Sequence, residues 1–445
     1  MRPTDCNGKA ESAPNNMPTT VLPRDEHPIS RTMISPRALT VLYRLQDKGF
    51  TAYLAGGCVR DLLLGKEPKD FDVVTDATPN QVKRAFRNCR LIGRRFRLAH
   101  VYFHDEVIEV ATFRSNETEE VGKQRQENAD GVVTRDNVFG SPEQDALRRD
   151  FTVNALFYNI EDFSIIDHAE GLPDLEARLM RCIGDPDERY IEDPVRMIRA
   201  IRFASTLDLN IEEDAWEAIL RNRDHLATAS NARLYEEMLK FFYSGAAARA
   251  FELLEESGLL KVLMPTFGHW LEQASEADRR WTWRALRLMD QCKKSELKEP
   301  PALLWALLFG AYHEARAQED IERGVPYFDA METAMRTHQQ GLVDRIRIPM
   351  RDMQHMLSIT RMQPRFRDHR PQSAAKLMRR EGFREAWTWF KFYARTRDLH
   401  DDEVRWWDDM LRKQHGKHKK RRPAPDKDAP QEEQSEPAPV ETDGE

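Results

Sequence analysis

One stretch of the chain, residues 53–75, constrains the fold more than any other. It opens with an apolar segment, 53–55, that predicts a strand, and it continues through Gly56 and Gly57 into 59–64, which predicts one or two helical turns. Glycine lets the backbone approach a ligand closely, and the free N–H groups at the start of a helix favour an anion. The stretch therefore predicts a strand, a tight turn and a helix arranged around a phosphate group.

Two aspartates, Asp70 and Asp72, follow in what we interpret as a second strand. Side chains alternate between the two faces of a strand, so residues two apart point the same way. Paired carboxylates suit Mg²⁺, a hard cation that takes oxygen ligands, retains waters and binds substrate phosphates. We therefore expect Asp70 and Asp72 to be metal ligands and catalytic residues. For an isolated Asp-x-Asp pair, the alternative is a polar strand end with two solvated side chains.

The glycine pair, the Val-Arg-Asp sequence and the Asp-x-Asp pair all occur within this stretch. In combination they resemble the active-site signature of the class II nucleotidyltransferases. That family contains the bacterial poly(A) polymerases and the CCA-adding tRNA nucleotidyltransferases. The resemblance implies two Mg²⁺ ions held by Asp70 and Asp72, and a nucleoside triphosphate held by Gly56, Gly57 and Arg60.

Composition restricts the compartment and the chemistry. The 445 residues, 40% hydrophobic and 32% charged, indicate a soluble protein of about two or three domains. No apolar run approaches the roughly 20 residues that span a bilayer. The N-terminus also lacks the apolar segment of a signal peptide, so we expect a cytoplasmic protein without a membrane partner. The five cysteines form no Cys-x-x-Cys pair, which argues against a zinc site and a disulfide framework.

Hydrophobic spacing divides the chain into two kinds of structure. We predict an α+β fold, with a mixed-sheet nucleotidyltransferase head followed by all-helical neck, body and tail regions. From about residue 185 onward, Ala, Leu, Glu, Arg and Trp recur at helical spacing with few strand signals. The predicted regions are a disordered N-terminus at 1–30, the catalytic head at 31–184, a helical neck that recognises the base at 185–245, a helical body with an RNA-binding region at 246–410, and a disordered tail, basic and then acidic, at 411–445.

A basic segment, Gly-Arg-Arg-Phe-Arg-Leu-Ala-His at 93–100, leads into two strand patterns between 99 and 113 that predict a hairpin. Its arginines, Arg94, Arg95 and Arg97, fit either a solvated edge strand or a turn that touches RNA or the triphosphate. The segment resembles the one typical of bacterial poly(A) polymerases, whereas CCA-adding enzymes tend to carry a His-Gly-Thr type sequence here. The resemblance implies that these arginines bind RNA.

A further motif lies within 145–157, where the apolar spacing predicts a helix. Asp145 and Arg149 are four residues apart and could simply pair on the helix surface. The sequence also matches the Arg-Arg-Asp motif that faces the triphosphate in the family. The resemblance therefore implies that Arg148 and Arg149 bind phosphate and that Asn154 belongs to the nucleotide-binding set.

A third carboxylate is expected beside Asp70 and Asp72. Asp150 directly follows the two arginines, and the resemblance makes it the preferred third active-site carboxylate and a catalytic residue. Glu109 is the alternative, although it fits the polar face of a strand equally well. The sequence leaves open which of the two completes the site.

The predicted neck contains a segment that the family uses to read the incoming base. Asp193 precedes Pro194, as expected for a helix cap followed by proline. Asp193, Arg196 and Arg199 recur every three residues and so share a face. The segment resembles the Glu-Asp-x-x-Arg element of the family, which implies that these three residues bind the nucleotide. The next helix, with Arg233, resembles the element that braces the head–neck junction.

The hydrogen-bonding groups of Asp193 and Arg196 limit the bases that this pair could select. Aspartate only accepts hydrogen bonds and arginine only donates them. Adenine and cytosine both present an amino donor and a ring acceptor, whereas guanine and uracil present the reverse order. We therefore expect the pair to reject GTP and UTP without separating ATP from CTP.

The C-terminal third interleaves aromatic and basic residues, as in 279–284, 387–392 and 405–407. Such residues can stack on exposed bases, but aromatic side chains at helical spacing more often form the core between helices. The net charge of −7 does not exclude RNA, because much of the acid lies in the C-terminal tail. A basic run before it is expected to bind RNA phosphates. Its members are Arg412, Lys413, Lys417, Lys419, Lys420, Arg421 and Arg422.

Together these features predict a template-independent RNA nucleotidyltransferase that is most similar to the bacterial poly(A) polymerases. The implied reaction joins AMP from ATP to an RNA 3′ end and releases pyrophosphate, with two Mg²⁺ ions. A CCA-adding enzyme is the close alternative, and a non-catalytic RNA-binding protein is the alternative from another class. Besides RNA 3′ ends, we expect RNA-decay or RNA-chaperone proteins as partners, and a monomer.

Overall fold

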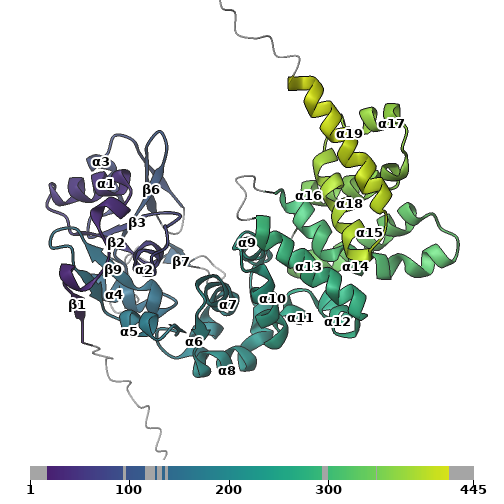
Figure 1. The fold of residues 1–445 in the computed structure, drawn as a ribbon. Helices are drawn as coiled ribbons and strands as arrows, with labels where there is room; N and C mark the ends of the chain where they lie inside the picture. The colour runs from purple at the N-terminus through teal and green to yellow at the C-terminus, as the bar shows by residue number, and fades with distance from the viewer. Residues whose placement is uncertain are drawn as a thin grey trace, which may run out of the picture.

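The protein consists of a sheet-containing head and a long helical arm that curves away from it (Figure 1). The computed structural model describes residues 18–93, 97–115, 126–127, 133–135, 139–292, 299–346 and 348–419. This arrangement confirms the predicted α+β class, with strands concentrated in the head and helices in the remainder.

The head is built on an eight-stranded mixed sheet. The strand order is β1 (Thr20–Leu22), β10 (Ile165–Asp167), β9 (Leu156–Asn159), β2 (Ala52–Ala55), β3 (Asp72–Thr75), β6 (Val107–Thr112), β5 (Leu98–Tyr102) and β4 (Cys89–Ile92). Only β3 and β6 run parallel, and every other neighbouring pair in this sheet is antiparallel. The predicted hairpin is present as the antiparallel pair β5–β6.

Short helices cover the sheet: α1 (Pro36–Gln46), α2 (Gly57–Leu63), α3 (Pro79–Ala85), α4 (Pro142–Leu147) and α5 (Gly171–Glu176). Ser35 caps α1 by accepting a hydrogen bond from the Arg37 N–H, as the Ser-Pro start predicts. Val41, Leu42 and Leu45 of α1 are fully buried, and the helix packs against β2, β3 and β6. Helix α2 begins two residues after the end of β2, which is a central strand of the sheet. The glycine turn between them is therefore anchored at the centre of the sheet.

Three boundaries differ from those predicted. Strand β1 pairs with β10, so part of the segment predicted to be disordered belongs to the sheet. The helix predicted over 145–157 was wrong beyond Leu147, where α4 ends. The chain then forms a short 3-10 helix, Thr152–Asn154, and enters β9. Helix α19 (Asp401–Lys419) also continues into the segment predicted as a disordered tail.

The arm begins with α6 (Pro186–Glu192), α7 (Val195–Leu207) and α8 (Glu213–Asn222) at the base of the molecule (Figure 1). A two-stranded parallel pair, β11 (Leu179–Met180) and β12 (Asn210–Ile211), joins the head to this part. The remaining helices are α9 (Asn231–Phe242), α10 (Ala247–Glu256), α11 (Leu259–Leu263), α12 (Pro265–Gln273), α13 (Glu276–Cys292), α14 (Pro301–Glu322), α15 (Tyr327–Arg345), α16 (Met350–Met362), α17 (Pro371–Leu377), α18 (Phe383–Arg397) and α19.

The aromatic residues of the arm form its core. Trp281, Trp389 and Trp407 are buried, and each indole N–H donates to a backbone carbonyl at 2.7 to 3.1 Å. Burial with a satisfied N–H is the usual state of a core tryptophan, so these three side chains are not free to stack on bases. None of the helices in the described part of the chain combines the length and apolarity that a membrane span requires.

Candidate active site

The turn at Gly56 and Gly57 is shaped so that only glycine fits its first position. Gly56 has φ +74° and ψ −124°, a conformation that L side chains rarely adopt. A Cβ atom at Gly56 would lie 2.7 Å from Arg149 Nη1 and 3.2 Å from the Asn154 carbonyl oxygen. The turn therefore lies directly against the segment of the predicted Arg-Arg-Asp motif, as phosphate binding by both would require.

Asp72 begins β3, whereas Asp70 lies in the loop before it. The prediction that both aspartates belong to one strand was therefore wrong for Asp70, and strand alternation does not fix its direction. The Asp70 side chain is 77% exposed, and its carboxylate is 3.9 Å from Lys69 Nζ. The loop leaves Asp70 free to turn toward a ligand held beside Asp72.

Glu109 is the carboxylate that the sheet places beside Asp72. The parallel pairing of β3 and β6 puts these two residues directly opposite each other, and in-register neighbours project from the same face of a sheet. Asp72 keeps contact with solvent, yet the surrounding protein, followed by the charge of Glu109, raises the pKa of Asp72 to about 6. Arg149 opposes this effect, and Asp70 adds to it. Mutual repulsion of this kind is what a bound cation relieves.

The carboxylates alone do not form a complete cage for a metal ion. In the part of the chain that the structure describes, no three His, Cys, Asp or Glu side chains are gathered closely enough to hold one. Glu109 also lies 3.4 Å from His100 Nε2 on the neighbouring strand. Mg²⁺ is commonly bound by one or two carboxylates together with waters and substrate phosphates. The residues present fit an ion that arrives with a triphosphate.

Asp150 occupies a different position from the one predicted. Its carboxylate accepts from Arg199 Nε at 2.8 Å and Nη2 at 2.5 Å, from Asn154 Nδ2 at 3.2 Å and from the Phe151 N–H at 3.0 Å. Burial alone would raise the pKa of Asp150, but Arg199 and these hydrogen bonds outweigh it and lower the pKa. Because Asp150 is saturated by partners, the geometry favours Glu109 as the third carboxylate, contrary to the sequence expectation.

Arg149 and Arg60, two of the predicted phosphate-binding arginines, contact the glycine turn and the adjacent Asn154. Arg149 Nη2 lies 3.0 Å from Asp145 Oδ2, and its Nη1 donates to the Asn154 carbonyl at 3.2 Å. Arg60 is buried; it donates to the Asn154 side-chain oxygen and, at 2.7 and 2.9 Å, to Asp61. Both arginines therefore hold the turn in shape while placing positive charge behind it.

Arg148 directly follows α4 and precedes Arg149 in the chain. Its backbone carbonyl accepts from Arg189 Nη2 at 2.8 Å, which ties the end of α4 to α6 in the neck. The Arg148 side chain is half-buried.

The three predicted base-reading residues are all engaged within the protein. Asp193 accepts from both terminal nitrogens of Arg233, at 2.9 and 2.7 Å, and from the Val195 N–H at 3.2 Å. Arg196 donates to the Arg189 carbonyl at 2.9 Å and to Glu192 at 2.5 Å, while Arg199 binds Asp150. Asp193 thus ends α6, binds the first N–H of α7 and pairs with Arg233 of α9. These elements all belong to the predicted neck, so this pair does not itself reach the head.

A cleft of about 1050 Å³ separates the head from the arm. Gly57, Asp70 and Asp72 line it from the head, and α7, α9, α13 and α14 line it from the arm. Its volume reaches that of the larger ligand pockets of proteins. The carboxylates therefore face an open space that is large enough for a nucleotide beside a second substrate.

The sequence missed several cleft residues: Lys66, Phe203, Lys240 and Tyr243. Lys66 Nζ donates to the Thr206 carbonyl at 3.2 Å, which joins the head to α7. The Phe203 ring lies within 5.3 Å of the guanidinium groups of Arg60, Arg199 and Arg202. The four-residue spacing of Arg199 and Phe203 was a detectable signal, but the approach of Arg60 from the head was not.

The predicted RNA-binding arginines and lysines lie far apart. Arg97 is exposed just before β5 in the head, whereas Arg412 and Lys413 are exposed on α19, a helix of the arm (Figure 1). Lys417 and Lys419 belong to α19. Arg94, Arg95, Lys420, Arg421 and Arg422 fall outside the described residues.

Comparison with known proteins assigns the chain to a family. Models of the Poly A polymerase head domain, of the probable RNA and SrmB-binding site of polymerase A and of the polymerase A arginine-rich C-terminus match residues 52–181, 208–271 and 323–439. Poly(A) polymerase I of Salmonella typhimurium is 42% identical over 407 residues, which cover 90% of this chain and 87% of the relative. Poly(A) polymerase I of Escherichia coli O157:H7 is 41% identical over the same share.

CCA-adding enzymes are also similar, over less of the chain. The enzyme of Lactobacillus johnsonii is 36% identical over 222 residues, 50% of this chain and 54% of the relative. Among solved structures, the CCA-adding enzyme of Bacillus stearothermophilus in complex with CTP superposes with a TM-score of 0.59 and 26% identity, covering 86% of this chain and 83% of the other. The predicted resemblance is confirmed, and the chain belongs to the poly(A) polymerase family of nucleotidyltransferases.

Proposed function

We propose that this enzyme joins AMP from ATP to the 3′-hydroxyl of RNA without a template and releases pyrophosphate. Polyadenylation is the activity that family membership assigns to it. The observation that carries the chemical part of the proposal is that Asp72, which lines the cleft together with Gly57, lies directly opposite Glu109 in the sheet. Paired carboxylates beside a phosphate-binding turn suit nucleotidyl transfer, whereas an RNA-binding module has no use for them.

Asp70 and Asp72 are the residues that would hold two Mg²⁺ ions, with Glu109 rather than Asp150 as the third carboxylate. When bound, the metal lowers the pKa of the attacking hydroxyl and neutralises the leaving pyrophosphate. The raised pKa of Asp72 supports this assignment, because partial burial and then the charge of Glu109 disfavour the carboxylate there, and a bound cation would offset both effects.

The glycine turn would hold the triphosphate. The Gly56 N–H donates to the Leu156 carbonyl at 2.9 Å, whereas Gly57 is the first residue of α2, where the N–H has no acceptor within its own helix. Arg60 and Arg149 supply positive charge beside it. We expect these two arginines to contribute mainly by fixing the turn, since Asp61 and Asp145 already bind them. Arg148 and Asn154 complete the proposed nucleotide-binding set. Positioning and charge stabilisation would then supply most of the rate enhancement.

Base selection would involve Asp193 and Arg196, with Arg199 as support. In this proposal the nucleotide base competes with Arg233 for Asp193 and with Glu192 for Arg196, since these are the present partners. The order of acceptor and donor fits adenine and cytosine and opposes guanine and uracil. The choice of ATP over CTP would then come from the shape of the pocket.

RNA would enter the cleft with its 3′ end beside Asp72 and its upstream part along the arm. Lys66, Lys69 and Lys240 line the cleft and offer charge to phosphates. We assign further phosphate contacts to Arg94, Arg95 and Arg97 on the head and, on the C-terminal segment, to Arg412, Lys413, Lys417, Lys419, Lys420, Arg421 and Arg422. RNA-decay or RNA-chaperone proteins as partners, a monomeric state and a cytoplasmic location complete the proposal.

The test is incubation of the purified protein with an unrelated oligoribonucleotide and each NTP separately, with Mg²⁺ present. We expect a long ladder with ATP. The same assay on a tRNA that lacks its terminal nucleotides addresses the CCA-adding alternative, which the half-length similarity to such enzymes keeps relevant. Extension confined to tRNA, requiring CTP and stopping after a few nucleotides, would overturn the proposal in favour of CCA addition.

A further inference from the structure

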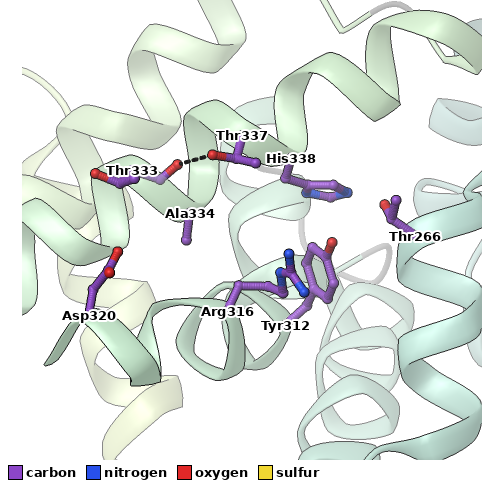
Figure 2. Close-up of a pocket in the computed structure, with 8 residues that line it drawn as sticks. All are labelled: Thr266, Tyr312, Arg316, Asp320, Thr333, Ala334, Thr337 and His338. Atoms are coloured by element: carbon purple, nitrogen blue, oxygen red, sulfur yellow. Dashed lines mark hydrogen bonds between the residues drawn. The ribbon is translucent and has the colours of Figure 1, made fainter. Parts of the chain in front are cut away.

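A second pocket lies within the arm, in helices that do not carry the carboxylates. It has a volume of about 170 Å³ and opens between α12, α14 and α15. Figure 2 shows Tyr312, Arg316 and His338 gathered beside Thr266, with Asp320 and Thr333 at the other end. Arg316, Thr333 and Thr337 of its lining are exposed, whereas Tyr312 and His338 are buried. A buried polar group that lacks a partner here requires an explanation, because it has lost its contacts with water.

The pocket contains a buried imidazole nitrogen without a partner. His338 is 5% exposed, and its Nε2 forms no hydrogen bond to any residue that the structure describes. Its other nitrogen, Nδ1, lies 2.9 Å from Nε2 of His313. Burial keeps both imidazoles neutral, because it lowers the pKa of His313 well below 6.5 and, together with Arg316, lowers that of His338 to about 3.

A neutral pair of this kind can present an N–H to the pocket. When His313 donates to His338 Nδ1, the proton of His338 is on Nε2. The Tyr312 ring packs against His338 with a centroid distance of 4.5 Å and forms one wall. The hydroxyls of Thr333 and Thr337 donate along α15, to the carbonyls of Asp329 and Thr333. With this tautomer, the donors left for a ligand are His338, Arg316 and Thr266.

The electrostatic character of the pocket favours an anion. Arg316 is exposed and forms no ion pair within the described residues. Thr266 is the second residue of α12, where the backbone N–H has no acceptor in its own helix and the helix dipole is positive. The one acidic lining residue, Asp320, lies at the far end of the pocket and pairs with Arg323 at 3.5 Å.

We propose that this pocket binds a phosphate group through Arg316, His338 and Thr266. A guanidinium, a neutral N–H donor and a helix N-terminus are each suited to phosphate oxygens, and here they converge on one space. The group could be a free phosphate ion or a backbone phosphate of bound RNA, since both have the same oxygen chemistry. The site is separate from the proposed active site, and its test is a binding measurement that does not depend on nucleotide transfer.

The experiment compares the full chain with Arg316→Gln, using two probes. Inorganic phosphate is titrated and followed by calorimetry, and a labelled single-stranded oligoribonucleotide is followed by fluorescence anisotropy at several salt concentrations. The matched control is Arg336→Gln on α15, because Arg336 is exposed, outside the pocket and paired with Glu332, which keeps Arg361 as a partner. Thr266→Val is a second variant within the pocket.

If the ion is free phosphate, Arg316→Gln weakens phosphate binding roughly tenfold, as expected for a lost charged hydrogen bond, and leaves RNA binding unchanged. If RNA supplies the group, the same variant weakens RNA binding and reduces the slope of log affinity against log salt by about 0.7. In both cases Thr266→Val has a smaller effect in the same direction and Arg336→Gln has none. Unchanged affinity for both probes, or an equal loss in Arg336→Gln, would overturn the proposal.

Discussion

The carboxylates of the head and those at the head–neck junction are held in opposite ways. Asp72 faces Glu109, no arginine among the described residues forms an ion pair with it, and its pKa is raised to about 6. Asp150 and Glu237 are each bound by arginines of α7, and these partners lower the pKa of both carboxyl groups despite their burial. The negative charge of Asp72 and Glu109 is thus available to a ligand, whereas that of Asp150 and Glu237 holds the head and the neck together.

The junction forms a continuous series of contacts. Glu237 on α9 binds Arg202 on α7 at 2.8 Å, while Arg199, one turn earlier on α7, binds Asp150 in the head. The Asp150 carboxylate also accepts a hydrogen bond from the Asn154 side-chain amide. The side-chain oxygen of Asn154 in turn accepts one from Arg60, next to the glycine turn. The neck is thereby connected to the proposed triphosphate site through ion pairs and hydrogen bonds, so substitutions there should change stability as well as activity.

The largest expected effect comes from Asp72→Asn. It should lower AMP transfer by more than roughly a hundredfold, because even indirect partners of a metal ligand are worth about ten- to a hundredfold. RNA binding, measured by anisotropy, should remain. The matched control is Asp208→Asn, which changes an aspartate that is 97% exposed. Near-normal transfer by Asp72→Asn at saturating Mg²⁺ would remove this residue from the metal site.

Asp150→Asn should reduce the stability of the folded protein, unlike Asp72→Asn. Breaking a buried ion pair leaves Arg199 without its main partner, so we expect a loss of about 3 kcal/mol in the free energy of unfolding. Asp72→Asn should not be destabilised, since it removes a repulsion from Glu109. Urea denaturation of the two variants beside the wild type provides the measurement. Equal stability of both variants would show that the two groups of carboxylates do not differ as the comparison states.

A smaller effect is expected at Asp193. If this residue meets the base, Asp193→Ala should relax rejection of GTP and UTP by about tenfold, within the roughly 1–3 kcal/mol expected for unpaired buried groups, and should change the ATP-to-CTP ratio less. Arg233→Ala is the control, because it removes the internal partner of Asp193 but keeps the carboxylate. Wild-type discrimination in Asp193→Ala would leave Asp193 only its helix-capping role.

The smallest effect concerns pH. The folded-state pKa of Asp72 is raised from 3.8 to about 6, so the folded protein binds this proton more tightly than the unfolded chain. The stabilisation of the folded protein by this proton is fully present below about pH 4 and is lost as the pH rises to about 6. Without divalent metal, wild-type melting temperature should therefore fall relative to that of Asp72→Asn over this interval. A constant difference between the two proteins would contradict the raised pKa.

Local sequence signals predicted the parts of the head that depend on neighbours in the chain. The Ser-Pro start of α1, the strand before Gly56 and the hairpin of β5 and β6 follow from capping, turn and alternation rules. The helix predicted beyond Leu147 was wrong because apolar residues there serve β9 and the core of the sheet, which the local pattern does not distinguish from a helix face.

The choice between Glu109 and Asp150 illustrates what the sequence left open. Glu109 is 37 positions from Asp72 in the printed sequence, and only the parallel register of β6 on β3 brings the two together. Likewise, nothing local to Asp150 indicated that Arg199 would occupy its carboxylate. Contacts between residues that are distant in the sequence depend on how the whole sheet and the neck assemble. The glycine turn and the Asp-x-Asp pair, by contrast, each lie within one short segment and can be recognised there.

Metal binding by four proteins, measured without RNA or turnover, tests whether Asp72 and Glu109, rather than Asp150, hold the ion. Mn²⁺ can replace Mg²⁺ at oxygen ligands and is followed by electron paramagnetic resonance in the presence of ATP. The wild type and Asp150→Asn, kept below their unfolding transitions, should bind the ion alike, while Asp72→Asn and Glu109→Gln should bind it at least roughly tenfold more weakly. Unimpaired binding by Asp72→Asn, or a loss confined to Asp150→Asn, would contradict the account.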